Sequence, residues 1–135
     1  MNSLDWPGAV TEIKKAAEFL RSKGCEKIGI VGFCMGGALT LASCIREPSS
    51  FTCGVCFYGI PPKAFADPVN LKLPMQFHFG DKDTAKGFSD KEAADNLKKT
   101  LVDSQDVSEF YQYPDGIYIV NTSFPLLIIQ ATMLL

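Results

Sequence analysis

Apolar and polar residues along the chain follow two spacings, one typical of helices and one typical of buried strands. After Asp5, which with Trp6-Pro7 opens a helix, apolar residues recur at helical spacing at Val10, Ile13, Ala17 and Leu20. Residues 27–33 then form a continuous apolar run, KIGIVGF, which is typical of a strand covered on both faces. The amino-terminal third therefore predicts a helix followed by a buried strand.

The same kind of pattern continues to residue 113. It predicts a helix over 35–46, a second buried strand over about 53–58, and further strands over 75–79 and 107–113. Ser89 followed by Glu92 reads as a capping box for a helix between the last two strands, with an apolar face at Ala93, Ala94, Leu97 and Leu101. This order predicts the α/β class, with a mostly parallel sheet and helices on both faces.

Length, charge and cysteine content limit the classes of function that this protein can have. A length of 135 residues favours one domain, and 47% hydrophobic residues are enough for a core. A formal charge of −2 gives no basic face for nucleic acid and no polybasic membrane patch, and the amino end lacks the features of a signal peptide. Five cysteines without a paired spacing scheme indicate a reducing compartment, for which the cytoplasm is the default.

Cys53 and Cys56 form a C-x-x-C motif, which in other contexts marks redox chemistry or half of a zinc site. Here it lies inside a predicted strand, where positions i and i+3 point to opposite faces. No second C-x-x-C exists, and the single His78 is too little to complete a metal site. We expect buried or packed residues here, and neither a metal nor a cofactor.

The stretch GFCMGG, residues 32–37, joins a predicted strand to a predicted helix. A P-loop would need a Lys and a Ser or Thr after it, and a dinucleotide fingerprint would need glycine where Cys34 stands. A nucleophile elbow, G-x-Nuc-x-G, fits better, because Gly32 and Gly36 are small where the sharp turn crowds the chain. Cys34 would be the nucleophile at a helix amino end that favours thiolate, and the backbone N–H of Met35 an oxyanion donor. The alternative is that Cys34 is a small buried residue in a tight turn.

Gly32-Phe33-Cys34-Met35-Gly36-Gly37 closely resembles the elbow of the dienelactone hydrolase family, α/β-hydrolases with a cysteine nucleophile. Further matches follow in order, at Asp5-Trp6, at Leu73-Pro74-Met75 through Asp83, and at Phe110-Tyr111 through Pro114, so that the resemblance covers about residues 5–116. It implies an α/β-hydrolase fold, Cys34 as nucleophile, and Asp83 rather than Asp81 as the acid that orients a histidine. The implied chemistry is attack on a small-molecule ester or lactone, an acyl-enzyme, and hydrolysis.

The chain departs from the family pattern at both ends. The family's histidine should follow Pro114 closely, but no histidine occurs after His78, and Tyr118 stands near the expected place. His78 itself is expected to be a packed strand residue. Family members begin with several strands before the first helix seen here, so we expect the fold to be incomplete at its amino and carboxyl ends. The strand that precedes the elbow would then expose an apolar edge, which predicts self-association.

Residues 117–135, IYIVNTSFPLLIIQATMLL, lose the charged, periodic character of the rest. We therefore divide the chain into a partial α/β-hydrolase domain, 1–116, and an atypical hydrophobic tail, 117–135. Polar residues and a proline interrupt the tail too often for a membrane span. A hydrophobic interface strand is one interpretation; we prefer the hypothesis that Gly116 marks a splice or gene-model boundary followed by translated non-coding sequence.

Three functions follow in order of preference. The first is hydrolysis of ester or lactone bonds through Cys34, impaired by the missing histidine. The second is a non-catalytic binding or interaction protein on the same fold. The third is a redox protein with Cys34 as its reactive thiol.

Overall fold

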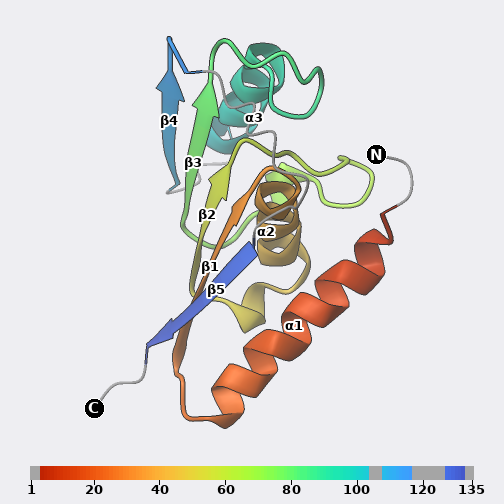
Figure 1. The fold of residues 1–135 in the computed structure, drawn as a ribbon, viewed down its shortest axis with the longest axis vertical. Coiled ribbons are helices and arrows are strands. Elements are labelled where there is room, and N and C mark those ends of the chain that lie inside the picture. Colours follow the sequence, from red (N-terminus) through yellow and green to blue (C-terminus); the bar gives the residue numbers. More distant parts are fainter. Residues whose placement is uncertain (1–3, 104–107, 117–126, 133–135) are drawn as a thin grey trace.

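A computed structural model of the chain describes residues 4–103, 108–116 and 127–132. These residues form a five-stranded sheet of order β4-β3-β2-β1-β5, in which β1 to β4 are parallel and β5 runs antiparallel to β1 (Figure 1). In chain order, the elements are α1 (Trp6–Ser22), β1 (Lys27–Phe33), α2 (Met35–Arg46), β2 (Cys53–Phe57), β3 (Met75–Gly80), α3 (Lys91–Asp103), β4 (Glu109–Tyr113) and β5 (Leu127–Thr132), with short 3₁₀ turns η1 (Pro48–Ser50) and η2 (Pro68–Asn70). None of the helices in these ranges is both long and apolar enough to cross a bilayer.

The predicted α/β class and parallel sheet are confirmed, and each predicted element has a counterpart at nearly the expected residues. The predicted fourth strand starts later, at Glu109, and Val107 lies outside the described residues. The capping box is wrong in its detail, because α3 begins at Lys91, too late for a cap by Ser89. The hydroxyl of Ser89 instead donates a hydrogen bond to the carboxylate of Asp83, 2.8 Å away.

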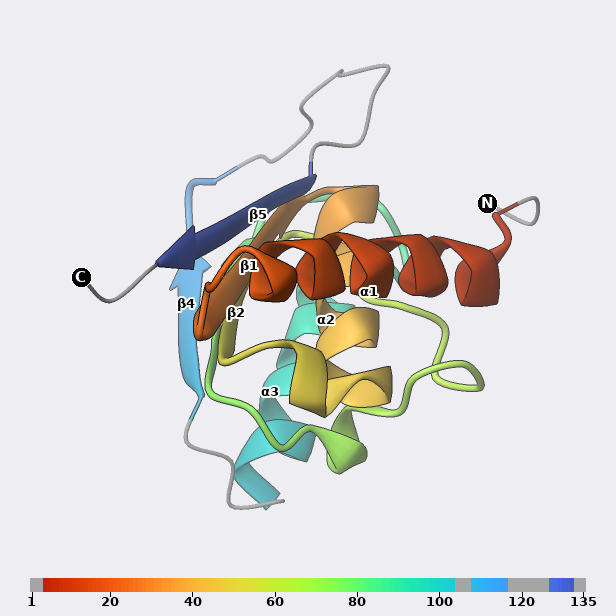
Figure 2. The ribbon, with the colours of Figure 1, turned by 90° about the horizontal axis from the view of Figure 1, so that it is seen from below.

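All three described α-helices lie against the same face of the sheet (Figure 2). Burial in the strands alternates accordingly, and the strand residues buried beneath these helices include Ile28, Ile30, Cys56, Phe77 and Phe79. The sequence predicted helices on both faces and a first strand buried on both sides. In the described residues the second face carries no helix, and the residues of β1 that point to it are half-buried or exposed.

A row of aromatic rings crosses this second, open face. The strand register sets Phe33 beside Phe57, Phe57 beside His78, and His78 beside Tyr111. Successive ring centroids are 4.5, 4.4 and 5.0 Å apart, and each pair of rings is within 15° of parallel. The Nδ1 of His78 also lies 2.8 Å from the hydroxyl of Tyr113. His78 is therefore a packed strand residue, as the sequence predicted.

We expect His78 to make the stability of the fold depend on pH. Partial burial lowers the pKa of His78 below its ordinary value of 6.5, so the unfolded chain binds this proton more readily than the folded chain does. Its contribution is therefore present above pH 6.5 and is lost as the pH falls from there through the lowered, folded-state pKa. Urea midpoints of the wild type and of His78→Gln, measured at about pH 7.5 and about pH 5.5, should show a smaller acid loss in the variant. Equal decreases of the urea midpoint in the two proteins would show that His78 is not a source of the pH dependence.

The strand before the elbow is not an exposed edge, contrary to the expectation from the sequence. Residues Lys27 to Gly32 pair in antiparallel register with Thr132 to Leu127, so β5 covers that side of β1. Part of the hydrophobic tail therefore forms a sheet strand, the interpretation that the sequence analysis ranked second, and the rest of the tail lies outside the described residues. Self-association stays a prediction, but the edges available for it are those of β4 and β5.

Candidate active site

The chain turns sharply from β1 into α2 at Cys34. Cys34 stands between the two elements with φ 56° and ψ −124°, a left-handed backbone that residues with a Cβ rarely adopt. Its thiol is half-buried, whereas those of Cys44 and Cys56 are fully buried. Strain of this kind persists only where the surrounding structure enforces it, so the local packing of the turn explains the position of Cys34.

Two glycines permit the close packing of this turn, because a side chain at either position would overlap neighbouring backbone atoms. A Cβ at Gly32 would overlap the backbone carbonyl of Gly36 and would lie 2.6 Å from the hydroxyl of Thr40. A Cβ at Gly37 would overlap the carbonyl of Phe57 in β2, so Gly37 lets α2 lie close against the sheet. The interpretation from the sequence was that the turn requires small residues at positions 32 and 36. The structure gives the physical cause, because the backbones of these two residues approach each other closely.

Met35 is the first residue of α2. The side chain of Cys34 makes no capping hydrogen bond, and the first helical bond of the turn runs from the N–H of Ala38 to the carbonyl of Cys34, 3.2 Å. The first N–H groups of a helix have no partners within the helix and carry the positive end of its dipole. The N–H of Met35 is one of these groups, at the residue that follows Cys34.

Asp83 lies in the loop after β3 and is only 7% exposed. Its two carboxylate oxygens accept separate hydrogen bonds, one from the N–H of Ala85 at 2.9 Å and one from the hydroxyl of Ser89 at 2.8 Å. Asp81, the weaker candidate, is half-exposed and accepts a long contact from Gln112 at 3.4 Å. Burial and fixed orientation both distinguish Asp83 from an ordinary turn aspartate; sequence reasoning found the residue but not its partner Ser89.

Cys34 and Asp83 follow β1 and β3, so both lie at the carboxyl edge of the parallel strands, where ligands bind in open α/β sheets. Strand β2 lies between them, which corresponds to roughly 10 Å between the backbones of β1 and β3. A group that links the two side chains would have to span that gap. His78 does not, because its ring is held on the open face between Phe57 and Tyr111. Tyr118 lies outside the described residues.

The other cysteines differ in exposure. Cys53 is exposed and Cys56 is buried, as expected for positions i and i+3 on opposite faces of a strand. Burial raises the pKa of the Cys56 thiol to about 12 and raises the pKa of Cys44 as well, which disfavours both thiolates. Within the described residues no group of three His, Cys, Asp or Glu side chains is arranged to hold a metal ion.

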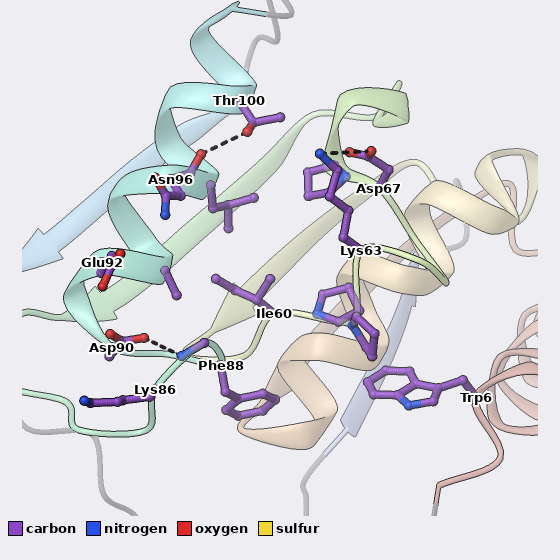
Figure 3. Close-up of a pocket in the computed structure, with 16 residues that line it drawn as sticks. Trp6, Ile60, Lys63, Asp67, Lys86, Phe88, Asp90, Glu92, Asn96 and Thr100 are labelled. Carbon is purple, nitrogen blue, oxygen red and sulfur yellow. Dashed lines mark hydrogen bonds and ion pairs between the residues drawn. The ribbon is translucent and has the colours of Figure 1, made fainter. Parts of the chain in front are cut away.

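A cleft of about 670 Å³ opens beside this edge, between α3 and the proline-rich loop after β2 (Figure 3). Ile60 lies at its centre, Phe88 and Trp6 line one end, and Lys63 pairs with Asp67 at 3.5 Å on the wall opposite α3. Cys34 is not among the residues that line it. No sequence pattern marks this cleft, because its walls come from segments that are far apart in the chain.

Comparison with known proteins adds independent information. The sequence model of the Dienelactone hydrolase family matches residues 1–118. Protein usf of Aquifex pyrophilus is 31% identical over 109 residues, which are 78% of this chain and 46% of that protein. The carboxymethylenebutenolidase homolog of Homo sapiens is 40% identical over 73 residues, 53% of this chain and 29% of that protein.

Among solved structures, one named as a dienelactone hydrolase from Klebsiella pneumoniae superposes with a TM-score of 0.56 at 22% identity. The match covers 69% of this chain and 41% of that one, and at this identity it shows a shared fold. The chain spans less than half of the length of each of these three proteins. The family match ends close to Gly116, although the domain boundary placed there stays a prediction.

Proposed function

Because this chain belongs to the dienelactone hydrolase family, we propose that it acts on ester or lactone bonds of small molecules, with Cys34 as the nucleophile. The observation that carries the proposal is the backbone of Cys34, whose φ of 56° holds the residue at the corner between β1 and α2. Tyr58 also has a positive φ, so this conformation supports the proposal together with the place of Cys34 between a strand and a helix and with the family match. The strain is consistent with a side chain presented to a substrate.

The proposed reaction has two steps. The sulfur of Cys34 attacks the carbonyl carbon, its proton passes to a base, and the N–H of Met35 stabilises the oxyanion of the tetrahedral intermediate. The bond from carbon to the alcohol oxygen then breaks, the alcohol takes up a proton, and a thioester remains on Cys34. Water hydrolyses the thioester to a carboxylic acid and restores the thiol. Asp83, buried and fixed by Ala85 and Ser89, would orient the base.

The base is the missing part of this proposal. No histidine follows His78 in the sequence, and His78 is packed between aromatic rings on the other face. General base catalysis contributes about 10²- to 10⁴-fold to such reactions. We therefore propose that this chain acylates slowly and turns over poorly.

Acyl-enzyme trapping with p-nitrophenyl acetate tests the proposal. We expect release of one nitrophenolate per chain and one acetyl group on Cys34 by peptide mass spectrometry. Cys34→Ala should abolish that adduct, whereas Cys53→Ala, which removes the exposed thiol of β2, should leave it unchanged. Free imidazole, as a substitute base, should speed acylation and deacylation of the wild type but not of Cys34→Ala. Acetylation confined to Cys53 would refute Cys34 as the nucleophile.

The second proposed function is a non-catalytic binding protein, favoured by the same absence of a histidine after position 78. It predicts no nitrophenolate burst in the experiment above. A redox role would instead give a peroxide-dependent sulfenic acid on Cys34. The five unpaired cysteines support a reducing compartment, and we propose the cytoplasm.

A further inference from the structure

Cys56 is a buried thiol that the proposed reaction does not use. It lies in β2 with no exposed surface, and its Sγ donates a hydrogen bond to the carbonyl of Gly59, 3.1 Å away. Burial raises the pKa of this thiol to about 12, so it keeps the proton that it donates. Cys44, the other fully buried cysteine, lies in α2, with its sulfur 3.0 Å from the place that a Cβ on Gly54 would take.

The carbonyl that Cys56 binds belongs to a segment that packs against the elbow. A Cβ at Gly59 would overlap the carbonyl of Cys34 and would lie 2.7 Å from the backbone nitrogen of Ala38. Two residues earlier, the carbonyl of Phe57 accepts the N–H of Cys34 at 3.1 Å. Phe57 and Gly59 therefore hold the backbone of Cys34 from the β2 side, one through a hydrogen bond and the other through close contact.

This segment is strained in its own right. Tyr58, between Phe57 and Gly59, has φ 37°, and its N–H donates to the carbonyl of His78 at 2.9 Å. A conformation that is so rare for a residue with a side chain persists only where its neighbours fix it. The hydrogen bonds from Tyr58 to His78 and from Cys56 to Gly59 provide that constraint on the two sides of the turn.

We propose that Cys56 is a positioning residue for Cys34: its thiol fixes the carbonyl of Gly59, and the Phe57–Gly59 turn then holds the elbow in its reactive conformation. The inference rests on the proposed function, in which Cys34 is the nucleophile. Cys56 touches neither the substrate nor the reacting sulfur and acts through backbone alone. Loss of its S–H would let the turn relax, and the carbonyl of Cys34 would move with it.

The test compares variants that differ in whether they keep a donor at position 56. Cys56→Ala and Cys56→Val remove the donor with opposite changes in volume, Cys56→Ser keeps one, and Cys44→Ala is the control at an equally buried cysteine. In each folded variant, acylation of Cys34 by p-nitrophenyl acetate and alkylation of Cys34 by iodoacetamide are measured by peptide mass spectrometry. Alkylation of the exposed Cys53 in the same molecules is the internal reference.

We expect Cys56→Ala and Cys56→Val to slow acylation at Cys34 about tenfold or more, because a displacement of about 1 Å at a reacting group can cost on the order of 100-fold. Cys56→Ser and Cys44→Ala should stay within about threefold of the wild type, since neither removes the donor to Gly59. Rescue by serine would separate positioning from packing, because serine fills less space than cysteine. Equal rates in Cys56→Ala, Cys56→Ser and Cys44→Ala would overturn the inference.

The experiment distinguishes a failure of the proposed function from a failure of the positioning role. In that case even the wild type would gain no acetyl group at Cys34. The iodoacetamide rates then still decide the positioning role: a changed rate at Cys34 in the donor-free variants alone would support it, and unchanged rates would refute it.

Discussion

Gly32→Ala is expected to destabilise the protein by about 3 kcal/mol or more, at the upper end of what overpacking a core costs. The added Cβ would overlap the backbone carbonyl of Gly36, and backbone atoms of a helix turn cannot rotate away as the end of a side chain can. Since small domains have a total stability of about 5–15 kcal/mol, this loss would unfold a much larger fraction of the molecules. Chemical denaturation in urea, followed by far-UV circular dichroism, measures the change.

Gly54→Ala is the matched control for this substitution. Gly54 is also a buried strand glycine, but a Cβ there would meet the sulfur of Cys44 and the terminal methyl of Met75, each at 3.0 Å. Side-chain ends of this kind can move by a few tenths of an ångström, so the cost should be clearly smaller. Equal losses for the two variants would mean that the close approach of Gly32 to Gly36 is not what shapes the elbow.

Truncation after Gly116 is expected to turn the protein into a self-associating species with a lower urea midpoint. It removes β5, whose residues Leu127 to Thr132 pair with Gly32 to Lys27, and leaves one side of β1 with unpaired backbone groups. An uncovered strand of this length is a template for pairing with another chain. Size-exclusion chromatography with light scattering would detect the association.

Two single substitutions test the pairing without shortening the chain. In an antiparallel ladder, the N–H groups of successive residues point alternately toward and away from the neighbouring strand. Of Ile128→Pro and Ile129→Pro, therefore, one should disrupt a ladder hydrogen bond and destabilise more than the other. A truncated chain that stays monomeric with an unchanged midpoint, together with two harmless prolines, would show that β5 adds nothing and would favour the view of the tail as translated non-coding sequence.

The elements up to residue 113 were predictable because their signals are local. The helical spacing from Val10 onward and the apolar run of 27–33 need only a few neighbouring residues to be recognised. The tight turn at Cys34 was predictable for the same reason, since Gly32 and Gly36 lie close to it in the sequence and the turn brings their backbones together. Its role as a nucleophile elbow stays a prediction.

Features that depend on pairing between distant segments were not predictable. Nothing in Leu127–Thr132 specifies β1 as its neighbour, and a continuous apolar run does not tell whether one or two faces of a strand are covered. The hydroxyl of Ser89 binds the carboxylate of Asp83 and does not cap the helix, and hydrogen bonds to a carboxylate are stronger than those to a neutral group. The contact of Cys56 with Gly59 was not predictable either, because the local sequence gives no sign of a turn with positive φ at Tyr58.

The placement of all three described helices on one side of the sheet has a consequence for how the strands can diverge in evolution. Hydrophilic replacements of Val31 or Val55 would meet solvent, whereas at Ile28 or Ile30 they would leave a polar group without a partner in the interior. If β1 and β2 are randomised and soluble variants are selected, hydrophilic residues should accordingly be accepted at every second position of each strand. The permissive positions are also where a more soluble version of this protein could be engineered without touching the elbow.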